Sequence, residues 1–169
     1  MAACGRMTAW RSRSPAQAAM LNPALLATVI AAAAIEYERA DGEPMPWPLT
    51  FLVAPLVVHR GTRNALPRDT RTHLGNWVGQ NPLIHAGIAP RAQSLAEPVR
   101  EGLRFGLAHS MLTVDEQGRL TGALADGPKV SPKRNTEVDQ MVAKAGLVGK
   151  WLAKIDQPAT AFAVLGVAP

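Results

Sequence analysis

The chain has 169 residues, which is enough for one domain with a substantial core and short for two. Hydrophobic residues make up 47% and charged residues 18%, so a chain that is disordered throughout is excluded. Aromatic residues are only 5%, and a core built mainly from Leu, Val and Ala favours helices. The net charge of +5 is compatible with nucleic-acid contact but is not evidence for it on its own.

Targeting and membrane signals are weak. The single cysteine, Cys4, excludes an internal disulfide and favours a reducing compartment, so we expect a cytoplasmic protein. The longest apolar run, residues 49–58, is too short to cross a bilayer. Residues 1–20 contain arginine, alanine and serine without an apolar h-region, and we interpret them as a disordered extension or a start codon placed too early. Residues 21–169 are then expected to form a single globular domain.

The first predicted element is a helix over residues 23–40. Asn22 and Pro23 are favoured at the N-cap and first helical position, and Asp41-Gly42 ends the apolar periodicity. The run 49–58 is apolar on every side and therefore buried, and its length alone does not distinguish helix from strand. Because Pro55 argues against a central strand, we favour a kinked helix and keep the strand as the alternative.

A basic connection is expected over residues 59–69, followed by a helix from 70 to 80. Four arginines in this part of the sequence form the best candidate for contact with an anion or a partner: Arg60, Arg63, Arg68 and Arg71. Together they are enough to neutralise a few phosphates. The alternative is a solvated loop whose arginines pair with acidic residues of this protein or of a partner.

Residues 88–122 have the order of a winged-helix-like segment. A short helix from Ile88, a second helix opened by Pro98 and a β-hairpin around Asp115–Gly118 follow one another. The second helix is not densely basic, and the hairpin tip carries Asp115 and Glu116, which would face phosphates badly. A protein-binding module is therefore favoured over a DNA reader.

The C-terminal part is predicted to be helical. A polar loop over 127–135 leads to a helix over about 136–154, which Thr136 and Asp139 can cap. A last short helix begins at Pro158 and ends at Gly166, so that helices occupy about 136–166. The predicted fold class is mostly α with a small β-hairpin (α+β).

No catalytic, cofactor or metal site is expected. The four histidines lack metal-ligand spacing, and neither serine of the helical region lies in a nucleophile elbow. The stretch Gly146–Lys150 has the wrong spacing for a phosphate-binding loop and lies in a predicted helix. An enzyme would need a pocket that gathers a histidine and a carboxylate, and no spacing indicates one. The residues considered were His59, His73, His85, His109, Ser94, Ser110 and Cys4.

Several stretches together resemble the middle component of bacterial three-component ABC systems. The resemblance extends from Leu21 to Pro169 and leaves out residues 1–20. It is carried by 21–26 (LNPALL), 36–38 (EYE), 51–59 (FLVAPLVVH), 62–63, 66–67, 149–154 (GKWLAK) and 161–167 (AFAVLGV).

This resemblance implies a non-enzymatic adaptor. Its partners would be an ABC ATPase subunit similar to chromosome-maintenance ATPases and an effector subunit, acting against phage and other invading DNA. Nucleic acid would be met through the complex, and neither a membrane nor a small-molecule substrate is implied. Trp77 and Trp151 are candidate anchors for partners, with core packing as the alternative for each. The rival hypothesis is a winged-helix DNA-binding transcriptional regulator.

Overall fold

The computed structural model describes residues 14–125 and 136–168. The elements are α1 (Pro15–Met20), α2 (Pro23–Asp41), β1 (Met45–Pro46), the 3-10 helix η2 (Trp47–Leu49), α3 (Thr50–Val57), α4 (Arg60–Ala65), α5 (Leu74–Gln80), α6 (Pro82–Ala86), α7 (Ile88–Ala108), β2 (Leu112–Val114), β3 (Arg119–Gly122), α8 (Glu137–Leu152) and α9 (Pro158–Leu165). The described part is mostly helical with one small antiparallel sheet, as the sequence predicted.

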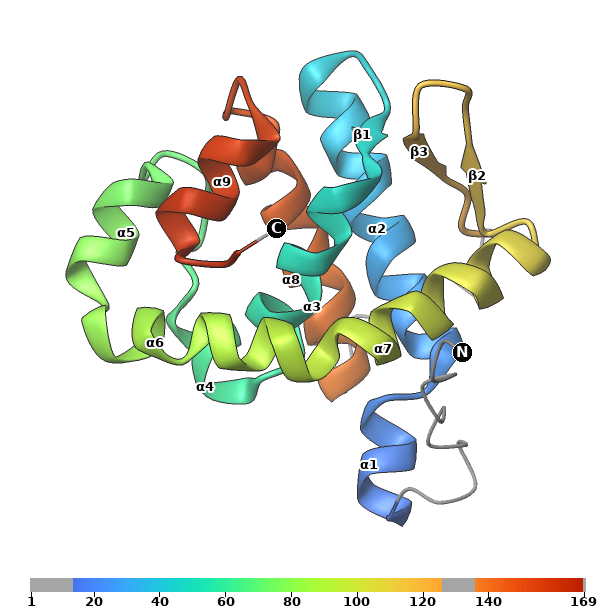
Figure 1. The fold of residues 1–169 in the computed structure, drawn as a ribbon, viewed down its shortest axis with the longest axis horizontal. Helices are drawn as coiled ribbons and strands as arrows, with labels where there is room; N and C mark the ends of the chain where they lie inside the picture. Colours follow the sequence, from blue (N-terminus) through green and yellow to red (C-terminus); the bar gives the residue numbers. More distant parts are fainter. Residues whose placement is uncertain (1–13, 126–135, 169) are drawn as a thin grey trace, which may run out of the picture.

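Helix α2 is the centre of the fold, with α8 on one side and α7 on another (Figure 1). Asn22 accepts a hydrogen bond from the Ala24 N–H at 2.8 Å, and Gly42 ends the helix with a φ of 88°. The helix is enclosed in its middle because Ala31 to Ala34, a full helical turn, are all buried. The sequence-based prediction of this helix is confirmed.

Short side chains allow the neighbours of α2 to approach its backbone. A Cβ atom on Gly149 of α8 would lie 2.1 Å from the Ala33 carbonyl oxygen, and one on Gly122 of β3 would lie 2.4 Å from the Ala31 carbonyl oxygen. Glycine is therefore required at both crossings. Residues of α2 contribute to two core clusters, one mainly with α3, α8 and α9 and the other with α7, the β2–β3 hairpin and Ala54 of α3.

Residues 50–57 form a helix, α3, with Pro55 inside it, so the helical interpretation of the apolar run is confirmed.

The predicted β-hairpin, formed by β2 and β3, is confirmed as well. The Asp115 carboxylate accepts hydrogen bonds from the Gln117 and Arg119 N–H groups, and Gly118 has a φ of 73°. Helix α8 begins with the predicted capping box of Thr136 and Asp139. Helix α9 ends at Gly166, as predicted.

The predicted break at Pro98 is wrong. Residues 88–108 form one continuous helix, α7, and not a pair of helices. An internal proline removes one hydrogen bond and costs about 3 kcal/mol. Burial of the helix on both sides of Pro98 offsets this cost. Ile88 and Ala92 before the proline, and Val99 and Gly102 after it, are all buried. The winged-helix-like segment placed at 88–122 therefore does not contain a helix pair.

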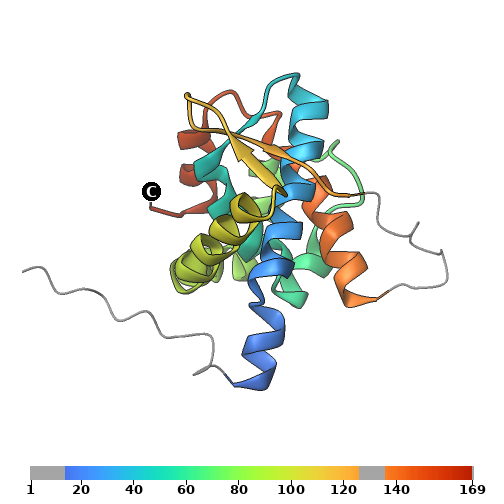
Figure 2. The same ribbon diagram turned by 90° about the vertical axis from the view of Figure 1, so that its right-hand side faces the viewer.

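The sheet has a third strand that the sequence did not indicate. Met45 and Pro46 pair with Leu120 and Arg119, so that the strand order is β1-β3-β2. The hairpin lies across one side of α2 (Figure 2). A strand of two residues is too short to show the alternation of apolar and polar residues that predicts a strand. Met45 and Pro46 are recognised as a strand only by their pairing with β3.

Three helices fall where none was predicted. Helix α4 lies in the expected basic connection, α6 follows α5 directly, and α1 lies within residues 1–20. Helix α1 projects away from the rest of the molecule in both views (Figures 1 and 2). Residues 15–20 thus have regular structure where we expected a disordered extension, while the domain boundary at residue 21 stays a prediction.

Cys4 and the predicted loop at 127–135 lie outside the described residues. In the part of the protein that is described, no helix is both long and apolar enough to cross a membrane.

Candidate interaction site

The four arginines of the predicted basic loop have different environments. Arg63 is only 1% exposed, and its Nη1 donates to the carbonyl oxygens of Val57 and Val58 at 2.7 and 3.0 Å. Its Nη2 donates to the Glu137 carboxylate at 2.6 Å. Arg63 therefore ties the end of α3 to the start of α8. Arg63 thus pairs with an acidic residue of this protein, which was the alternative, and its role as a contact for an anion or partner stays a prediction.

The other three arginines are exposed. Arg71 forms a two-pronged contact with Asp69, and these hydrogen bonds lower the pKa of that carboxyl to about 2. Arg60 and Arg68 form no ion pair with any described residue. The basic surface thus shrinks from four cations to two that are uncommitted, which is small for binding a nucleic-acid backbone.

Trp151 and Trp77 both belong to the core. Each is 2% exposed, and their rings meet edge to face with centroids 5.5 Å apart. The Trp151 indole N–H donates to the Thr72 carbonyl oxygen at 2.7 Å, and that of Trp77 donates to the Ala65 carbonyl oxygen at 2.8 Å. Both rings pack in the core, which was the alternative for each, and the role of Trp151 as a partner contact stays a prediction.

The net positive charge lies outside the described residues. Of the 18 basic residues, six lie in 1–13 and 126–135, and of the 13 acidic residues, one does. The described part therefore carries twelve of each and has no net formal charge. The six are Arg6, Arg11, Arg13, Lys129, Lys133 and Arg134, and the acidic residue is Asp126.

The histidines have structural positions. His59 caps α4 by accepting from the Thr62 N–H at 3.1 Å, and burial, with Arg91 and Arg63 nearby, lowers its pKa. His85 contacts the Val164 carbonyl oxygen, and His109 stacks on Phe105. Within the described ranges, no three His, Cys, Asp or Glu residues come together in a way that could hold a metal ion.

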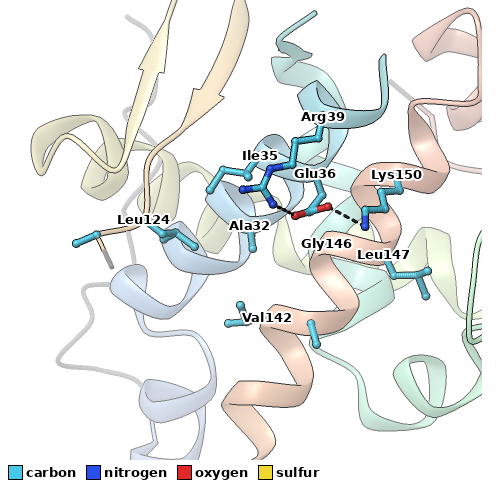
Figure 3. Close-up of a pocket in the computed structure, with 11 residues that line it drawn as sticks. Ala32, Ile35, Glu36, Arg39, Leu124, Val142, Gly146, Leu147 and Lys150 are labelled. Atoms are coloured by element: carbon cyan, nitrogen blue, oxygen red, sulfur yellow. Dashed lines mark hydrogen bonds and ion pairs between the residues drawn. The ribbon is translucent and has the colours of Figure 1, made fainter. Parts of the chain in front are cut away.

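A hollow of about 680 Å³ lies between α2 and α8 (Figure 3). Its volume is in the range of protein sites that take a ligand or a few side chains. Two stripes at helical spacing line it, together with the segment just after β3. The lining residues are Ala32, Ile35, Glu36 and Arg39 of α2, Leu124 and Ala125, and Val142, Ala143, Gly146, Leu147 and Lys150 of α8.

The charged end of this α2/α8 groove is organised around Glu36. Its carboxylate accepts hydrogen bonds from the Arg39 guanidinium and, at 2.9 Å, from the Lys150 ammonium. The hydrogen bond from Lys150 is the main cause that lowers the pKa of Glu36, with Arg39 acting in the same direction and partial burial opposing both. Glu36 is therefore held in its ionised form. Gly146 lies directly opposite, since a Cβ atom there would be 3.1 Å from the Glu36 Cγ.

The sequence contained a signal for this groove that we did not use. Glu36 was noted within the stretch 36–38 of the family resemblance, while the segment ending at Lys150 was considered as a false phosphate loop. On each helix a second stripe at spacings of three and four runs beside the core stripe. Which helix faces which is a tertiary property, so the stripes could not be joined before the fold was known.

Among known proteins, one family model matches this protein. It is described as "ABC-three component (ABC-3C) system Middle Component 3" and matches residues 10–169. The match begins before residue 21, so part of the N-terminal segment that our resemblance left out belongs to the matched region. No curated protein and no solved structure matches the sequence.

Proposed function

The chain belongs to the Middle Component 3 family of ABC three-component systems, and we propose that it is a non-enzymatic adaptor between an ABC ATPase and an effector. The observation that carries the proposal is the α2/α8 groove. Its apolar lining and exposed cations are features of a contact surface, and the helices that form it are the centre of the fold. A middle component with such a surface is suited to holding other subunits together.

In this proposal the chemistry resides in the partners. ATP hydrolysis takes place in a chromosome-maintenance-like ATPase subunit, and the effector acts on phage or other invading DNA in the bacterial cytoplasm. Three of the four histidines support a passive role for this protein, because His59, His85 and His109 contact structural groups of their own domain. The adaptor contributes binding surfaces rather than reacting groups.

The adaptor role is tested by reconstituting the three components encoded together. Tagged ATPase is co-expressed with the effector, with and without the middle component, and the complexes are separated by size-exclusion chromatography with mass measurement. We expect the effector to co-elute with the ATPase only when the middle component is present. Direct binding of the effector to the ATPase at equal affinity in its absence would contradict the proposal.

A winged-helix DNA-binding regulator is the second candidate, and the strand order supports it. Helix α7 is followed directly by the β2–β3 hairpin, as a winged-helix-like segment over 88–122 requires, and β3 lies in the centre of the sheet. Against DNA binding stand the exposed acids at the hairpin tip, Asp115 and Glu116. The winged-helix-like arrangement therefore fits a protein-binding module better.

Salt dependence distinguishes the two candidates. If Arg60 and Arg68 each neutralise one phosphate, they contribute a slope of about −2 to a plot of the logarithm of the DNA-binding constant against the logarithm of the salt concentration. The DNA-binding hypothesis expects tight duplex binding by the isolated protein, weakened by replacing both arginines with alanine. The adaptor proposal expects weak binding alone, unchanged by these replacements, measured by fluorescence anisotropy at several salt concentrations.

A further inference from the structure

The floor of the α2/α8 groove is aliphatic. Ile35 of α2, Leu124 after β3, and Val142 and Leu147 of α8 line it, and each of these side chains is only partly buried. Apolar side chains that line an open hollow leave surface that gains free energy when it is covered. The floor therefore suits aliphatic side chains of an incoming segment.

The rim of the groove carries an excess of positive charge. Both oxygens of the Glu36 carboxylate are occupied, Oε1 by Arg39 and Oε2 by Lys150. The two cations share this single carboxylate, and their side chains stay 70% and 49% exposed. Each has further N–H donors that Glu36 does not use. A second carboxylate placed between them would meet two charged donors, and Glu36 is the one acidic residue among the described residues of the lining (Figure 3).

We propose that the α2/α8 groove docks a short segment of another subunit of the same system, made of aliphatic side chains followed by a carboxylate that Arg39 and Lys150 bind. The inference rests on the proposed adaptor function and adds the position and chemistry of one contact. Charge complementarity selects the occupant, because the two cations outnumber Glu36 and would repel a basic segment, and a purely polar segment would cover the aliphatic floor with polar atoms. The carboxylate is that of an Asp or Glu residue or the C-terminal carboxylate of the partner subunit.

A blocking variant tests the position of the contact. Ala143 is exposed and lines the groove, so A143R places a long cationic side chain in the hollow without changing the core. The matched control is A163R, the same change at an exposed alanine of α9 outside the groove. In the reconstituted complex we expect A143R to weaken binding of one partner subunit by at least about tenfold and A163R to leave it unchanged. Equal melting temperatures of both variants verify that the fold is intact.

A charge variant tests the chemistry. R39E reverses the exposed cation at the rim, and R68E is the matched control because Arg68 is also exposed and lies outside the groove lining. We expect a loss of at least about tenfold in affinity for R39E, with a weaker salt dependence of the remaining binding. An effect of R68E equal to that of R39E would show only a general response to net charge and would overturn the inference.

Photo-crosslinking identifies the occupant. Benzoylphenylalanine at position 143 in the assembled complex should crosslink to a peptide of the ATPase or effector that contains aliphatic residues next to Asp, Glu or a C-terminus, as read by mass spectrometry. A crosslink to a second copy of the middle component, or to a peptide without a carboxylate near the aliphatic residues, overturns the inference. If A143R assembles with both partner subunits as tightly as the wild type does, the inference about the groove is overturned, while the proposed adaptor function stands. A wild-type protein that joins neither subunit refutes both.

Discussion

Replacing Gly149 by alanine is expected to destabilise the protein, although alanine is the better helix former. A Cβ atom at this position would lie 2.1, 2.9 and 3.0 Å from the carbonyl oxygen, carbonyl carbon and Cα of Ala33. All three are backbone atoms, so a rotamer change cannot relieve the contact. Opening the shortest distance to 3.0 Å requires the two helices to separate by about 0.9 Å at their crossing.

The magnitude follows from two opposing effects. Overpacking costs about 1–3 kcal/mol and occasionally more. This contact lies at the upper end, about 3 kcal/mol, because backbone atoms cannot move aside and the separation of α2 and α8 also loosens contacts along the rest of their interface. The helix propensity of alanine returns about 1 kcal/mol. We expect a net loss of about 2 kcal/mol, which corresponds to a fall in Tm of about 4–8 °C for a protein of this size.

The assay is urea unfolding followed by tryptophan fluorescence, since the buried indoles of Trp77 and Trp151 report on the core. The matched control is Gly79→Ala in α5, where a Cβ atom would meet nothing within 4 Å. This control should be as stable as the wild type or more stable by up to about 1 kcal/mol. If Gly149→Ala is also as stable as the wild type, the close crossing of α2 and α8 is not as described and the reasoning fails.

Three further predictions concern ties between elements. Trp151→Phe loses the hydrogen bond to Thr72 and part of the indole packing, and a loss of about 1–3 kcal/mol in chemical denaturation is expected, whereas an unchanged midpoint would contradict the buried contact. Arg63→Met leaves two helix-end carbonyls and the Glu137 carboxylate without their donor and should cost about 3 kcal/mol, far more than Glu137→Gln, because that carboxylate is half exposed. Glu36 has a lowered pKa, so its contribution to stability is complete above its ordinary value of 4.5 and is lost as the pH falls through the lower folded value. The stability of Glu36→Gln should therefore fall less steeply on acidification than that of the wild type, and identical acid limbs would refute the assignment.

Local rules predicted the elements whose ends are encoded nearby. Asn22-Pro23, the Thr136 capping box and the Asp115–Gly118 turn each satisfy backbone groups within a few residues, so they can be recognised without knowledge of the fold. The two short helices α4 and α6 were missed because five or six residues carry little periodicity. The burial of candidate site residues could not be predicted. The cluster of four arginines marked Arg63 and residue type marked Trp151 as contacts, and both side chains are buried.

The sequence by itself determined that the protein is helical, where its strongest caps and its hairpin lie, and which family it resembles. Only the tertiary structure decided that α7 continues through Pro98, that Met45 and Pro46 form a strand, and that Glu36 and Lys150 meet at one end of a groove. The reason is physical. Caps and turns are stabilised by groups a few residues apart, whereas these three features depend on burial and pairing between segments that are distant in the sequence, and a one-dimensional pattern does not contain the side chains that meet there.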